Sequence, residues 1–164
     1  MAIALNLTMP LKQDPETQQR LQQLAATFSQ TAQPAIDAAL SGSQIVHFAR
    51  LLVIDNKYIQ ILTEFDGDPM QYTEFFRKEL GPVFQLVFSL VEGAPSWDDL
   101  NNPNSFYEFT HGYNLTSLGT STVGNQGRGY LFSAFGDLTV REIRQRLNLP
   151  AAGQSGQPAA PPSS

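Results

Sequence analysis

Apolar and polar side chains alternate at the start of the chain. The apolar members of this pattern are spaced two residues apart: Ile3, Leu5, Leu7 and Met9. A period of two is typical of a strand that buries one face. We therefore expect an N-terminal strand that ends at Pro10.

The apolar spacing then changes to that of a helix. Asp14 followed by Pro15 is typical of an N-cap with proline at the first helical position. Apolar side chains recur at helical spacing as far as Phe28. Pro34 predicts a break, after which a second helical stretch ends at the Ser-Gly-Ser sequence 41–43.

An almost unbroken apolar run occupies residues 45–54. Its length and its Val and Ile content favour a buried strand over a helix. Residues 55–57 predict a hairpin loop, and 58–65 the returning strand. A helix follows with Asp68 as its N-cap, and then a helix over 83–91 that is apolar nearly all round. Such a helix is buried on most sides, either in this chain or against a partner.

The last third of the chain carries weaker signals. Capping boxes at 105–108 and 139–142 predict two further helices. We expect a strand over 130–135 and one weak strand near 121–123. From Pro150 onward the sequence has no charge and no large apolar side chain. We therefore expect residues 150–164 to form a flexible tail.

The order of these elements predicts an α+β fold. Before the last helix it is βαββαβ, the ferredoxin-like order: one antiparallel sheet with helices on one face, extended by a helical insert and a C-terminal helix. We assign residues 1–149 to this domain. The opposite sheet face must also be covered, commonly by a second copy of the sheet, so a homo-oligomer is expected.

Three stretches carry a family resemblance. They are VHFAR at 46–50, FDGD at 65–68 and YLFSAFGDLTVREI at 130–143. Together they resemble modules of the dimeric α+β barrel superfamily that are associated with peroxidase-type proteins. The resemblance covers about 45–147. It implies a ferredoxin-like module that pairs sheet to sheet, in a superfamily that includes haem enzymes.

The amino-acid composition argues against several classes of function. The chain has 164 residues, of which only 15% are charged, with a net charge of −5 and no cysteine. An acidic balance argues against nucleic-acid binding. Without cysteine, disulfides and thiolate metal sites are excluded. No apolar stretch is long enough to cross a bilayer and no signal peptide is evident, so we expect a cytoplasmic protein without a membrane partner.

His47 and Arg50 are polar residues within the apolar run. Residues three apart on a strand point to opposite faces, so the two form a paired site only if a bulge intervenes. His47 is either a ligand or acid–base group facing a cavity, or a buried, hydrogen-bonded histidine. Arg50 is interpreted as the partner of a carboxylate.

Three acidic residues lie two apart at Glu64, Asp66 and Asp68. Their oxygen atoms would suit a hard cation, but the ligand pattern of a calcium loop is incomplete, so no metal site is predicted. We favour a salt bridge from Glu64 or Asp66 to Arg50. His111 is either a haem ligand in an aromatic pocket or a histidine favoured by the dipole at a helix C-terminus.

No catalytic constellation is found, so the leading hypothesis is a non-catalytic module. It would bind a small apolar ligand or serve in assembly, and would self-associate through its sheet without a cofactor. The candidate ligand-binding residues are His47, Arg50, Asp66 and His111. The alternative is a haem-dependent, peroxidase-like oxidoreductase with His111 or His47 as ligand and Arg50 on the distal side.

Overall fold

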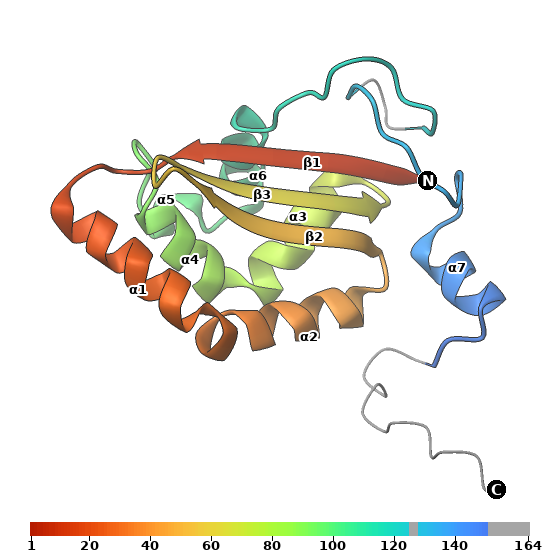
Figure 1. The fold of residues 1–164 in the computed structure, drawn as a ribbon, viewed down its shortest axis with the longest axis horizontal. Helices are drawn as coiled ribbons and strands as arrows, with labels where there is room; N and C mark the ends of the chain where they lie inside the picture. The colour runs from red at the N-terminus through yellow and green to blue at the C-terminus, as the bar shows by residue number, and fades with distance from the viewer. Residues whose placement is uncertain (125–127, 151–164) are drawn as a thin grey trace, which may run out of the picture.

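The computed structural model describes residues 1–124 and 128–150. The predicted tail 150–164 lies outside the described residues apart from Pro150. Within the described ranges the chain forms one antiparallel sheet, with helices packed against one of its faces (Figure 1). The predicted α+β class is therefore confirmed.

The sheet contains β1 (Ala2–Pro10), β2 (Val46–Ile54) and β3 (Tyr58–Asp66) in the order β1-β3-β2. Both pairings are antiparallel, and in register Leu7 lies opposite Ile61. The predicted hairpin loop joins β2 to β3, and Asp55 and Asn56 both adopt positive φ values in it, 51° and 54°. Paired positive φ angles suit the twist of a tight hairpin, and Asp and Asn tolerate them better than most residues.

The described residues form seven helices. They are α1 (Pro15–Thr31), α2 (Gln33–Ser43), α3 (Pro69–Glu79), α4 (Gly81–Ser89), α5 (Trp97–Leu100), α6 (Pro103–Gly112) and α7 (Val140–Arg146). None of these helices has the length and hydropathy that crossing a bilayer requires.

The first residues of the helices can be compared with the N-caps that the sequence predicts. The Asp14 and Asp68 side chains accept backbone hydrogen bonds at the first turns of α1 and α3, as expected. Thr139 forms the predicted capping box of α7. The capping box predicted at 105–108 is wrong, because Asn102 caps α6 and accepts from the N–H of Ser105 at 3.0 Å. Proline at the first helical position makes this earlier start favourable.

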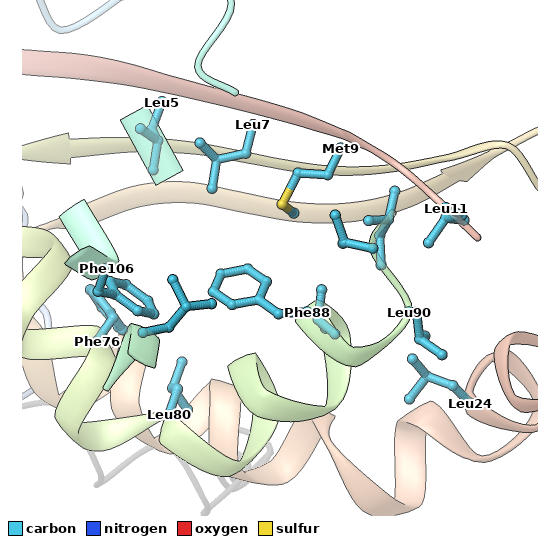
Figure 2. Close-up of a cluster of buried hydrophobic side chains, with 14 of the residues drawn as sticks. Leu5, Leu7, Met9, Leu11, Leu24, Phe76, Leu80, Phe88, Leu90 and Phe106 are labelled. Carbon is cyan, nitrogen blue, oxygen red and sulfur yellow. The ribbon is translucent and has the colours of Figure 1, made fainter. Parts of the chain in front are cut away.

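The core lies between the inner face of the sheet and the helices. Alternate β1 side chains point into it and meet apolar side chains from the helices (Figure 2). The labelled members are Leu5, Leu7, Met9, Leu11, Leu24, Phe76, Leu80, Phe88, Leu90 and Phe106. Ring stacking adds to this burial: the Phe65 and Tyr72 rings lie 3.7 Å apart and nearly parallel.

The predicted strand over 130–135 does not form, nor does the weak strand near 121–123. A fourth strand of a ferredoxin-like sheet would pair with the free edge of β1. That edge is already used: Thr8 donates to the carbonyl of Tyr113 at 3.0 Å, and Leu115 donates to the carbonyl of Asn6 at 2.9 Å. The full βαββαβ pattern is therefore absent from residues 1–124 and 128–150.

The chain beyond this edge turns back on itself without forming a regular strand. Tyr130 donates to the carbonyl of Leu118 at 2.9 Å. Gly129 has a φ of +81°, and a Cβ atom there would collide with the Ser117 carbonyl. Only glycine fits this close crossing. The segment then reaches α7, which lies beside the N-terminal end of β1 (Figure 1).

Candidate functional site

A cavity of about 280 Å³ lies between the inner face of the sheet and the helices α2, α3, α4 and α6. We call it the inner cavity. The sheet contributes Leu5, Leu7, Leu51, Ile61 and Thr63 to its walls. The helices contribute mainly apolar side chains, among them Ile36, Leu40, Phe76, Leu80, Val83, Phe84, Val87 and Phe106. The walls are mainly apolar, and Gln33, Asp37 and Arg50 also line the cavity.

The polar side chains deep in the inner cavity are satisfied within the protein. Tyr72 donates its hydroxyl hydrogen to Thr63 Oγ1 at 2.8 Å. Thr73 donates to the Pro69 carbonyl at 2.6 Å, and Thr110 donates to a carbonyl of its own helix. Burial raises the pKa of Tyr72, so its phenol stays neutral. These groups therefore leave little hydrogen-bonding capacity for a ligand.

The inner cavity opens between α2 and the edge of the sheet. Gln33 and Asp37 of α2 and Ala49 of β2 line the cavity and are also exposed to solvent. No residue of α2 is fully buried. The helix covers the cavity without closing it, which leaves an entry path for a small molecule.

Asp66 organises a polar cluster at the end of β3. Its Oδ1 atom lies 3.0 Å from His47 Nε2 and accepts from the Met1 amino group at 3.2 Å. Its Oδ2 atom accepts from the Val140 N–H at 2.7 Å. Burial opposes ionisation, but the hydrogen bonds from His47 and Val140 outweigh it and hold the pKa of Asp66 below its ordinary value. Asp66 is therefore ionised, and its carboxylate joins His47, the Met1 amino group and the Val140 N–H.

A β-bulge between Val46 and Phe48 decides how His47 and Arg50 are placed. Arg50 lies opposite Leu62 and is exposed. The bulge leaves His47 without a register partner on β3, and the charges of both residues act on Glu64. The predicted salt bridge from Arg50 to Glu64 or Asp66 is not among the ion pairs of the described residues.

Glu64 lies next to this cluster and has an unusual environment. Its Oε2 atom is buried and has no hydrogen-bond partner. Burial raises the pKa of Glu64, while the positive charges of Arg50 and His47 only partly offset that effect. Sequence reasoning saw Glu64 as a salt-bridge partner and missed its isolation, because the covering segment comes from a distant part of the chain.

A second cavity, of about 260 Å³, lies against the opposite face of the sheet. We call it the outer cavity. His47, Phe48 and Glu64 line it on the sheet side. Residues 131–135, Val140, Ile143 and Arg144 line it from the C-terminal segment.

His111 lines neither cavity, although the preceding residue, Thr110, lines the inner one. Its ring stacks on Tyr107 with centroids 3.8 Å apart, and its Nε2 atom lies 3.0 Å from Arg128 Nη2. Burial and the neighbouring Arg128 lower the pKa of His111. The structure therefore brings His47 and Asp66 together, places Arg50 near them, and separates His111 from all three.

The arrangement does not suit a haem. No histidine lines the inner cavity. The Nε2 atom of His47 is engaged by Asp66, and that of His111 faces Arg128. Among the residues that the structure describes, no group of three or more His, Cys, Asp or Glu side chains could hold a metal ion. The haem alternative remains a prediction, and titration with haemin followed by the Soret band tests it.

Comparisons of the chain with protein-family models, with curated proteins and with solved structures give no match. The resemblance to the dimeric α+β barrel superfamily therefore remains a prediction. The geometry of the two cavities is therefore the basis of the functional proposal.

Proposed function

We propose that the protein is a non-catalytic module that binds a small apolar ligand in the inner cavity. The observation that carries this proposal is the cavity of about 280 Å³, with its apolar walls and its opening beside α2. Well-packed interiors leave few voids larger than a water molecule. An apolar pocket of this size that opens to solvent beside α2 suits a small apolar occupant.

The hydrogen bonds around the inner cavity define the chemistry of that occupant. Tyr72, Thr73 and Thr110 all donate to atoms of the protein. The Thr63 hydroxyl accepts from Tyr72, and its own hydrogen is free to reach a ligand oxygen. We propose a ligand with an apolar body and at most one acceptor atom in the interior of the cavity, because a second polar group there would be buried without a partner.

Self-association through the outer face of the sheet is the second part of the proposal. Leu52, Ile54 and Tyr58 are all exposed there, at 42%, 42% and 45%. A cluster of exposed large apolar side chains favours association. A second copy of this face would remove these side chains from water.

A fluorescence titration with N-phenyl-1-naphthylamine, a neutral apolar probe, tests ligand binding. Val83→Phe fills part of the inner cavity, because Val83 lines it and is only partly buried. We expect the variant to bind the probe about tenfold more weakly, since the added ring takes the ligand's place. Val53→Phe is the matched control, because Val53 is exposed and lies outside the cavity.

Equal binding by Val83→Phe and the unmodified protein would contradict the proposal, as would an absence of binding by the unmodified protein. Native mass spectrometry of gently purified protein adds an independent result. A co-purified small molecule that is lost from Val83→Phe but kept by Val53→Phe would support the inner cavity as its site.

A further inference from the structure

The outer cavity is a second site, separate from the proposed apolar pocket. It lies on the opposite face of the sheet, and its lining shares no residue with the inner cavity. Its floor comes from β1, β2 and β3, through Ala2, Phe48 and Glu64. Its roof comes from residues 131–144, more than sixty positions further along the chain than Glu64.

The roof is fixed in place by specific contacts. The Val140 N–H donates to Asp66 Oδ2 at 2.7 Å, which holds the start of α7 against the end of β3. The Thr139 capping box orders the same turn. Val140 and Ile143 of this helix line the cavity. The cavity is therefore a defined feature of the fold.

The floor contains a carboxylate oxygen without a partner. Glu64 Oε2 is buried, lies in a residue that lines the cavity, and accepts no hydrogen bond. A buried acceptor left unsatisfied costs free energy. The positive groups nearby do not supply the missing bond: His47 bonds Asp66, Arg50 forms no ion pair in the described part of the chain, and Arg144 donates to the Pro150 carbonyl.

The walls are aromatic. Phe48 comes from the sheet, and Phe132 and Phe135 come from the covering segment. All three rings are also partly open to solvent. Aromatic faces attract organic cations, and a nearby carboxylate adds to that attraction.

We propose that the outer cavity binds a small organic ammonium ion. One N–H of the ammonium group donates to Glu64 Oε2, and the apolar body of the ligand lies against Phe48, Phe132 and Phe135. A metal ion would find one free carboxylate and too few further oxygen ligands. An anion would meet the Glu64 charge. An ammonium ion with a hydrocarbon body satisfies both the unpartnered oxygen and the aromatic walls.

The test uses 2-phenylethylamine as the probe and 2-phenylethanol as its uncharged counterpart, with binding to the full chain measured by calorimetry. We expect the amine to bind at least about tenfold more tightly than the alcohol, because only the amine makes a charge-assisted hydrogen bond. Glu64→Gln should remove this preference. Glu79→Gln is the matched control, since Glu79 is exposed on α3 and lies outside the outer cavity.

Phe132→Ala provides a second variant that leaves the carboxylate intact. Its side chain is 65% exposed, so the substitution removes little buried surface. We expect several-fold weaker binding of the amine, because the apolar contact between the Phe132 ring and the body of the ligand is lost. The proposal is overturned if the amine binds no better than the alcohol, or if Glu64→Gln keeps the preference. It is equally overturned if both probes fail to bind. Val83→Phe should leave amine binding unchanged, which separates this result from the fate of the inner cavity.

Discussion

The carboxylate of Asp66 accepts a hydrogen bond from the backbone N–H of Val140 at 2.7 Å, across 74 residues of sequence. This bond joins the end of β3 to the first residue of α7. The opposite oxygen of Asp66 lies 3.0 Å from His47 Nε2, so one side chain links two strands and the C-terminal helix. The outer cavity exists because this link holds its roof over the sheet.

Asp66→Ala should release the C-terminal helix. The substitution leaves the Val140 N–H and the His47 ring without their acceptor, and we expect a loss of roughly 2–3 kcal/mol in the free energy of unfolding. Amide hydrogen exchange should accelerate over residues 140–146. Asp98→Ala is the control, because Asp98 is exposed on α5 and forms no ion pair with the described residues. Unchanged exchange in Asp66→Ala would show that other contacts hold α7.

Glu64→Gln should change the pH dependence of stability. Burial raises the pKa of Glu64 in the folded protein, so the folded state holds this proton more tightly than the unfolded state. The contribution of Glu64 to stability is therefore most favourable below the ordinary glutamate pKa of about 4.3 and falls as pH rises through the folded pKa. Glutamine does not titrate.

Urea denaturation at about pH 3.5 and at about pH 7 measures this effect. The free energy of unfolding of Glu64→Gln minus that of the unmodified protein should be more positive at the higher pH. Other titrating groups are common to both proteins and cancel in the difference. A difference that stays constant or falls with pH would contradict the assignment.

Tyr72→Phe should destabilise the protein through the loss of one buried hydrogen bond. The Tyr72 hydroxyl donates to Thr63 Oγ1, and its removal should cost about 1 kcal/mol in the free energy of unfolding. Tyr58→Phe is the control, because Tyr58 is 45% exposed. A double-mutant cycle with Thr63→Val isolates the pair. An interaction energy near zero would mean that the bond contributes nothing to stability.

A double substitution, Leu52→Glu with Ile54→Glu, should disrupt self-association. Both side chains are 42% exposed on the outer face of the sheet. In a dimer the added carboxylates would be buried without partners, so we expect at least about tenfold weaker association in sedimentation equilibrium. Met70→Glu is the control, because Met70 is exposed to a similar degree but belongs to α3. A strictly monomeric unmodified protein at high concentration would refute the dimer.

Local signals in the sequence predicted local structure well. The alternation along β1, the 55–57 hairpin loop and the caps at Asp14, Asp68 and Thr139 all form as expected. Each of these features depends on residues within a few positions of one another. The sequence pattern therefore contains the information that such features need.

Most of the failures involve distant partners, whereas the misplaced cap of α6 is a local one. The strand predicted at 130–135 does not form, because the backbone of 113–115 already occupies the edge of β1. No local sequence pattern indicates whether residues 113–115 or residues 130–135 pair with the edge of β1. The sequence predicts a salt bridge from Glu64 or Asp66 to Arg50, but in the structure Asp66 pairs with His47 and the Oε2 atom of Glu64 has no partner. The inner cavity likewise results from how α2 sits over the sheet.

Methyl-resolved NMR during titration with N-phenyl-1-naphthylamine tests ligand binding in the inner cavity most directly. Leu7, Ile61 and Val87 line that cavity from three different elements. We expect saturable shifts of their methyl resonances, with Leu52 and Ile54 on the outer face unaffected by the probe. Shifts confined to Leu52 and Ile54, or no saturable shift at all, would contradict this expectation.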